Sequence, residues 1–148
     1  MTDVGKTALE YFGRDYNCAQ AVLRAVLEEK GMFMDEFPYL AAGLGGGVSH
    51  EGNVCGAVTG AILAIGMITS QSALDVKGHK NRTYHHGEEF IAKFKNEFDT
   101  VICRELTGLD ISNPAELERG RQTGIFQELC PKFVKRAAVL VSDMFPEK

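Results

Sequence analysis

The sequence VCGAVTGAILAIGMIT, residues 54–69, decides the fold because it is the longest apolar stretch of this 148-residue chain. It falls short of the roughly 20 residues that a membrane-spanning helix needs. A helix without a polar face is expected to lie buried at the centre of a domain. Gly56 and Gly60, four residues apart and followed by alanines, leave a smooth stripe on which another backbone can pack closely. A tightly packed central helix is therefore the first prediction.

The segments before this stretch also have helical periodicity. Thr2 or Asp3 can cap a first helix, which the pattern extends through Phe12. Asn17, with Gln20 three residues later, has the spacing of a capping box, so a second helix is predicted to begin there and to run to a glycine at position 31. Asn53 is the expected cap of the central helix.

After the central stretch, the pattern predicts a polar connection over residues 70–80 and one long amphipathic helix over residues 81–106. Asn113-Pro114 predicts the start of another helix, and Pro131 is expected to start the last one, which ends before Pro146. No alternating pattern typical of strands is present. The sequence therefore predicts an all-α single domain over residues 1–148, with about five to six helices around the Gly/Ala-rich helix.

Charge and composition exclude some classes of function. The net charge is −4, and lysine and arginine are scattered along the chain, which argues against nucleic-acid binding. The N-terminal residues show no basic region followed by an apolar one, so no secretory signal is visible. We expect a cytoplasmic protein that does not bind membranes. In that compartment four cysteines favour metal binding, catalysis or burial over a disulfide framework.

The four cysteines, Cys18, Cys55, Cys103 and Cys130, are the candidate catalytic residues and the candidate metal ligands. Three of them, all but Cys103, are predicted to lie where a helix begins. The helix dipole and free N–H groups at that position stabilise a thiolate. Cys18 and Cys130 are thus expected to titrate below about 8.5 and to be alkylated first, and Cys103, near a helix C-terminus, last. We expect at least three of the four to lie close together.

A glycine-rich loop precedes the central helix. Such glycines allow positive φ angles and let backbone N–H groups converge on a ligand, so Gly45, Gly46, Gly47 and Gly56 are predicted to bind a cofactor. The loop lacks the GKS or GKT of a phosphate-binding loop. His50 in this loop is interpreted as a surface residue, with a base or ligand role near Cys55 as the alternative.

CGAVTG at residues 55–60, with Cys18 before it and Cys103 and Cys130 after it, resembles the C_GCAxxG_C_C family of redox-active proteins. The resemblance covers roughly residues 10–140. It implies a redox role and an iron–sulfur cluster as a candidate cofactor. The related domain in multihaem cytochromes uses CxxCH haem attachment, which this chain lacks, so haem is not implied.

Three functions remain open from the sequence. The first is a redox protein, in which the cysteines exchange dithiol for disulfide or hold an iron–sulfur cluster for electron transfer, with a partner protein or small molecule. The second is a structural or storage metal site, such as zinc bound by four cysteines. The third is a non-enzymatic module that forms a homodimer through the glycine–alanine face.

Overall fold

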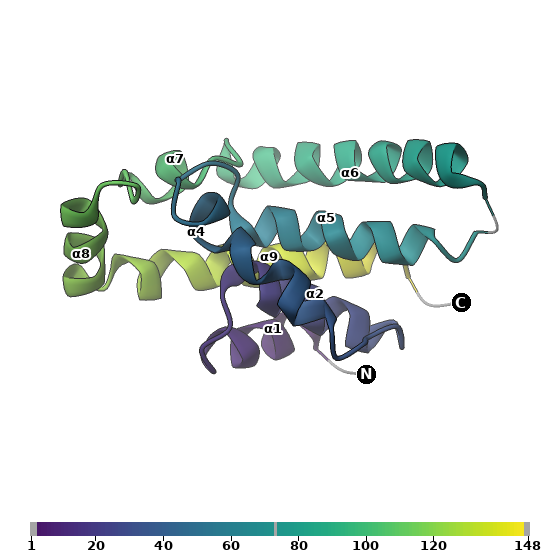
Figure 1. Ribbon diagram of the computed structural model, residues 1–148, viewed down its shortest axis with the longest axis horizontal. Coiled ribbons are helices and arrows are strands. Elements are labelled where there is room, and N and C mark those ends of the chain that lie inside the picture. Colours follow the sequence, from purple (N-terminus) through teal and green to yellow (C-terminus); the bar gives the residue numbers. More distant parts are fainter. Residues whose placement is uncertain (1–2, 73, 147–148) are drawn as a thin grey trace.

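The computed structural model describes residues 3–72 and 74–146, and in these ranges the chain is all-α, as predicted (Figure 1). Short helical segments raise the number of helices above the expected five to six. In chain order the elements are α1 (Val4–Phe12), α2 (Cys18–Glu29), α3 (Phe37–Ala41), the 3₁₀ turn η1 (Ala42–Leu44), α4 (Gly45–Val48), α5 (Gly56–Thr69), α6 (Val76–Phe98), α7 (Cys103–Thr107), α8 (Pro114–Thr123) and α9 (Ile125–Met144).

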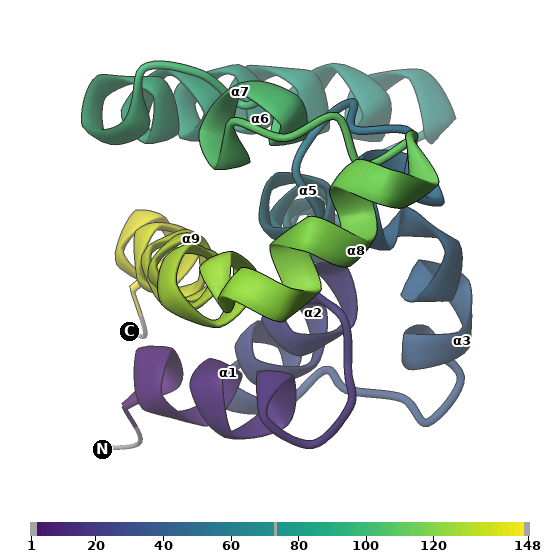
Figure 2. The same ribbon diagram turned by 90° about the vertical axis from the view of Figure 1, so that its left-hand side faces the viewer.

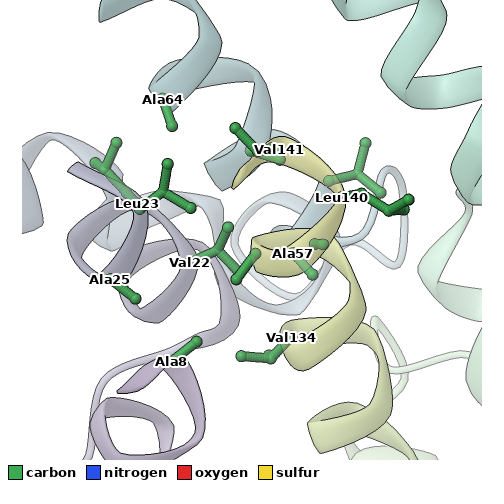
Figure 3. Packing of buried hydrophobic residues seen from close by; sticks show 14 of the residues in the cluster. Ala8, Val22, Leu23, Ala25, Ala57, Ala64, Val134, Leu140 and Val141 are labelled. Carbon is green, nitrogen blue, oxygen red and sulfur yellow. The ribbon is translucent and has the colours of Figure 1, made fainter. Parts of the chain in front are cut away.

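Helix α5 lies at the centre of the bundle, between α6 on one side and α2 and α9 on the other (Figures 1 and 2). Its small side chains are fully buried at Ala57, Ala61 and Ala64. Figure 3 shows side chains of α1, α2, α5 and α9 converging on one core. The closest approach is at Gly60, where an added Cβ atom would lie 2.4 Å from the Ala19 carbonyl oxygen of α2. The predicted central packing helix is confirmed.

Three of the six predicted helix starts are confirmed by their caps. The Asp3 side chain accepts from the Lys6 N–H, and the capping box between Asn17 and Gln20 is complete. Asn113 caps α8, with Pro114 as its first residue. Thr2, the alternative cap of α1, lies outside the described residues.

Three predicted helix boundaries are wrong. Helix α5 is preceded by Cys55 rather than capped by Asn53. The long helix begins at Val76, where the Asp75 side chain accepts from a backbone N–H, and it ends at Phe98 because Asp99 turns into the left-handed region at φ 72°. Extended residues follow, so the predicted helix over 81–106 is really two helices.

The last helix also begins earlier than predicted. Gly124, at φ 74°, ends α8 and starts α9 at Ile125. Pro131 therefore lies inside α9 instead of starting it. A proline inside a helix lacks one N–H donor, which loosens the helical hydrogen bonding just after Cys130.

The loop elements gather at one end of the bundle. Figure 1 shows α4, α7 and α8 together at the left-hand end, and Figure 2 shows α8 crossing that end in front of α5. Among the described helices, none combines the length and apolar content needed to cross a membrane. The start of α2 and the start of α5 both point towards the end that α8 covers.

Candidate functional site: four cysteines in one cavity

A cavity of about 200 Å³ lies at this end of the bundle, and all four cysteines line it. We call it the four-cysteine cavity. The cysteines come from four different helices or helix starts, so only the tertiary fold brings them together. The prediction that at least three of them lie close together is confirmed.

Cys18 is the first residue of α2, and the capping box fixes its position. The Asn17 side chain accepts from the Gln20 N–H at 2.9 Å, and the Gln20 side chain accepts from the Asn17 N–H at 3.0 Å. The Asn17 amide also donates to the Ala42 carbonyl, 2.9 Å away. These three bonds tie the start of α2 to the segment that leads into the glycine loop.

Backbone pairing holds Cys55 and Cys103. Val54 and Ile102 form an isolated antiparallel bridge in the described chain, in which the Cys55 N–H donates to the Val101 carbonyl at 2.8 Å. The Cys103 N–H donates to a carbonyl of the opposite segment at 2.6 Å. These bonds hold the start of α5, at Cys55, beside the start of α7, at Cys103.

This pairing corrects the prediction for Cys103. The residue begins α7 rather than lying near the C-terminus of a long helix. Burial still raises its pKa, from the ordinary 9.0 to about 11. Burial raises the pKa of the Cys55 thiol further, to about 12, although backbone N–H groups at the start of α5 partly oppose the shift. Both thiols are therefore neutral at pH 7.

Cys18 at the start of α2 and Cys130 in α9 both line the cavity, and each shifts the pKa of the other. The Cys130 sulfur, followed by burial and the other two sulfurs, raises the pKa of Cys18 well above its ordinary value, whereas Cys18 lowers the pKa of Cys130. The predicted low pKa of Cys18 is wrong, because the Cys130 sulfur, burial and the other sulfurs outweigh the helix dipole. The pKa of Cys130 is lowered as predicted, but the cause is the neighbouring Cys18 and not a helix start.

The glycine loop forms one wall of the cavity through an unusual backbone. Five consecutive residues have positive φ: Gly46, Gly47, Val48, Ser49 and His50. This is a left-handed turn, which costs a non-glycine residue roughly 1–2 kcal/mol. Hydrogen bonds hold it, including one from the Gly52 N–H to the Gly46 carbonyl at 3.1 Å.

The glycines that the sequence singled out fit closely against the cysteines. A Cβ atom at Gly47 would lie 2.8 Å from the Cys103 Cβ atom, and one at Gly56 would lie 3.1 Å from the Cys18 Cβ atom. Gly46, Gly47 and Gly56 line the cavity, and Gly45 packs against the side chain of Asn17. This packing accounts for glycine at these positions, while their binding of a cofactor stays a prediction.

The structure adds one charged residue that the sequence did not single out, Arg121 of α8, which lines the cavity. His50, for which a role near Cys55 was the alternative interpretation, lines the cavity as well. Most of the remaining wall is apolar and includes Phe12, Phe126 and Phe133. No local motif marks Arg121 as a site residue, because α8 reaches the cavity only through the fold.

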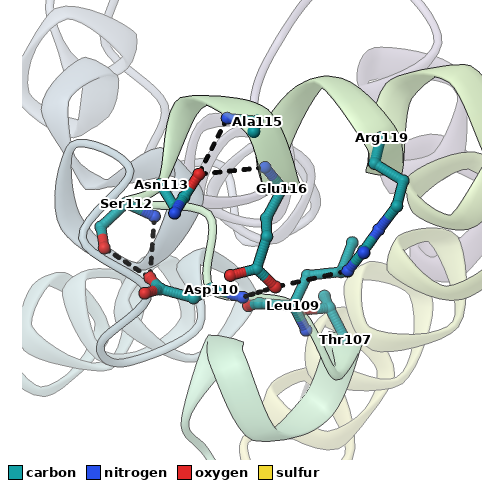
Figure 4. Close-up of polar contacts among 8 residues, drawn as sticks. All are labelled: Thr107, Leu109, Asp110, Ser112, Asn113, Ala115, Glu116 and Arg119. Carbon is teal, nitrogen blue, oxygen red and sulfur yellow. Dashed lines mark hydrogen bonds and ion pairs between the residues drawn. The ribbon is translucent and has the colours of Figure 1, made fainter.

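A polar network places α8 over the cavity (Figure 4). The Asp110 carboxylate accepts from the Ser112 N–H at 3.1 Å, and the Glu116 carboxylate accepts from the Asp110 N–H at 3.3 Å. The Asn113 side chain accepts from the Ala115 N–H at 2.9 Å. These bonds fix the turn between α7 and α8, and so the direction in which α8 runs.

The cavity brings a donor set of four thiols together. Four thiols are the soft ligands that zinc and iron–sulfur clusters use. However, within residues 3–72 and 74–146 no three His, Cys, Asp or Glu side chains are grouped so that they could hold one ion. As arranged, the site does not fit a metal, and the metal-ligand role predicted for the four cysteines is not confirmed.

A family model described as "Putative redox-active protein (C_GCAxxG_C_C)" matches residues 16–144. The matched range contains all four cysteines and the glycine loop. No curated protein and no solved structure matches the chain.

Proposed function

Since the chain belongs to the C_GCAxxG_C_C family of redox-active proteins, we propose that it works by dithiol–disulfide exchange, with Cys18 and Cys130 as the reactive pair. The observation that carries this proposal is that both cysteines are free and line the same cavity, where each is the main cause of the other's pKa shift. A sulfur of lowered pKa thus lies near a protonated one, which is the arrangement that a nucleophile and its resolving thiol need.

Cys130 is the attacking residue. Its thiolate attacks one sulfur of an external disulfide, the external S–S bond breaks, and one substrate thiolate leaves. A mixed disulfide between Cys130 and the other half of the substrate remains. Pro131, the residue after Cys130, has no backbone N–H, so one hydrogen bond of α9 is missing beside Cys130.

Cys18 then resolves the mixed disulfide. Once Cys130 is bonded to the substrate its sulfur is no longer a thiolate, so the main cause of the raised pKa of Cys18 is removed. Cys18 loses its proton to solvent and attacks the Cys130 sulfur, which expels the second substrate thiolate. Two electrons have passed from the protein dithiol to the substrate, and the protein holds a Cys18–Cys130 disulfide.

Disulfide mapping tests this proposal. The reduced full-length protein is equilibrated in glutathione redox buffers, trapped with an alkylating agent, digested and mapped by mass spectrometry. We expect a linked Cys18–Cys130 peptide to be the main oxidised species. Cys18→Ser should accumulate a glutathione adduct on Cys130, whereas Cys130→Ser should form neither the adduct nor the link. Circular dichroism melts check that both variants are folded.

Two results would overturn the proposal. One is oxidation that links other cysteines and leaves Cys18 and Cys130 reduced. The other is a stoichiometric iron–sulfur chromophore in anaerobically purified protein, lost on any single Cys→Ser change, because all four sulfurs would then be ligands. Absorption spectra with iron and sulfide analysis would reveal that chromophore.

A free dithiol of this kind works in a reducing compartment, which supports our proposal of a cytoplasmic location. The redox partner, and a homodimer formed through an exposed face of the bundle, are also proposals. Within the described residues, the glycine–alanine stripe of α5 is covered by α2 at Gly60. The dimer, if formed, would therefore use another surface.

A further inference from the structure

The wall of the four-cysteine cavity is unevenly charged. Among the described lining residues Arg121 is the only side chain with a permanent positive charge; the lining also includes His50 but no aspartate or glutamate. The rest of the wall is mainly the thiols and apolar side chains. A substrate in this cavity therefore meets a positive charge and apolar surface beside the sulfurs.

Arg121 is available to a ligand. Its nearest acidic partner is Glu118, one turn earlier on α8, with a nitrogen–oxygen distance of 3.8 Å and more than half of each side chain exposed. Such a surface ion pair contributes little and exchanges readily with solvent or another anion. Cys130, on α9, lines the same cavity as Arg121 on α8, so a ligand that enters the cavity can contact both groups.

From this arrangement, and resting on the proposed dithiol chemistry, we propose that the substrate is a small organic disulfide carrying a carboxylate, and that Arg121 selects it. A cavity of about 200 Å³ is below the usual range for drug-sized ligands, so it suits one short arm of such a molecule. The carboxylate binds the guanidinium, and the S–S bond is directed at Cys130.

The reaction balances without another component. The Cys130 thiolate and then the Cys18 thiolate displace the two halves of the disulfide R–S–S–R. The products are two thiols R–SH, which take up the protons that the protein thiols give up, and the Cys18–Cys130 disulfide. Arg121 holds the carboxylate of R throughout and takes no part in bond making, so it is a specificity-determining residue.

Three small disulfides of similar length and different charge test this proposal: 3,3′-dithiodipropionate, 2-hydroxyethyl disulfide and cystamine, which are anionic, neutral and cationic. The rate of protein oxidation by each is measured by stopped flow and divided by the rate of the same disulfide with 2-mercaptoethanol. We expect the normalised rate to be about three- to tenfold higher for the anionic than for the neutral compound, and lowest for the cationic one. Added salt should reduce the difference.

Arg121→Gln should bring the anionic-to-neutral ratio close to one without changing the normalised rate of the neutral disulfide more than about twofold. Arg119→Gln is the matched control. Arg119 is on the same helix, pairs with Glu116 at 3.4 Å and does not line the cavity, so its loss should leave the ratio unchanged.

The outcomes separate this inference from the proposed function. If none of the three disulfides oxidises Cys18 and Cys130, the dithiol proposal itself fails. If all three react but the normalised rates do not depend on charge, or if Arg121→Gln keeps the anionic preference, dithiol chemistry stands and the role of Arg121 is refuted. A loss of preference in Arg119→Gln as well would show a general surface-charge effect and would also refute it.

Discussion

Replacing Gly60 by alanine tests how tightly α5 packs against α2 next to the site. In the native structure an added Cβ atom would lie 2.4 Å from the Ala19 carbonyl oxygen and 2.9 Å from the Ala19 Cα atom. Both are backbone atoms of α2, so no side chain can rotate away. The helix must shift instead, and Cys18 is the residue next to Ala19.

Two opposing effects determine the size of the change. Alanine in a helix gains roughly 0.5–1 kcal/mol over glycine from backbone entropy. Overpacking a core costs about 1–3 kcal/mol and occasionally more, and a rigid backbone neighbour places Gly60 at the upper end. We therefore expect Gly60→Ala to lower the free energy of unfolding by about 1–3 kcal/mol. For a chain of this length the melting temperature should fall by about 3–10 °C.

Gly66→Ala is the matched control on the same helix. The nearest atom to an added Cβ there is a Thr83 methyl carbon at 3.9 Å, an ordinary contact. The entropy gain then acts alone, and the melting temperature should rise by about 1–4 °C. Urea unfolding and thermal melts followed by circular dichroism measure both variants. Equal shifts at the two positions, or a more stable Gly60→Ala protein, would refute the close-packing argument.

Three further predictions concern the cysteines and the cap of α2. At pH 7 iodoacetamide should alkylate Cys130 before Cys55, because the pKa of Cys130 is lowered and that of Cys55 is raised to about 12 by burial; peptide mapping that finds Cys55 ahead of Cys130 would contradict this. The free energy of unfolding should fall as pH rises from about 9 to 11. In this range the buried thiols of Cys55 and Cys103 keep their protons in the folded state and lose them on unfolding. Each thiol contributes a slope of up to about 1.4 kcal/mol per pH unit. In Cys55→Ala the slope in urea titrations should be shallower, and an unchanged slope would count against buried neutral thiols. Asn17→Ala should cost about 1–2 kcal/mol in urea unfolding, since it removes the side-chain cap of α2 and the bond to the Ala42 carbonyl; a loss below about 0.3 kcal/mol would show that the cap is dispensable.

The sequence by itself determined those features that depend on neighbours along the chain. The apolar run of α5 predicts a central buried helix, because a helix without a polar face is stable only when its apolar surface is buried in a core. The caps at Asp3, Asn17 and Asn113 were also predictable, because a capping side chain bonds to backbone groups within three residues. The order of the four cysteines around CGAVTG was sufficient to indicate the family.

Tertiary structure alone decided where the cysteines lie and how they titrate. Cys103 pairs through its backbone with residue 53, and nothing local to residues 99–103 encodes that partner. From α2 alone, the helix dipole predicts a lowered pKa for Cys18. The pKa is raised instead, because the sulfur of Cys130, more than 100 residues away in the sequence, lies nearby and other elements bury Cys18. Desolvation and sulfur–sulfur contacts depend on groups that are close in space and distant in sequence. For the same physical reason Arg121 became a site residue only when the turn after α7 brought α8 across the end of the bundle.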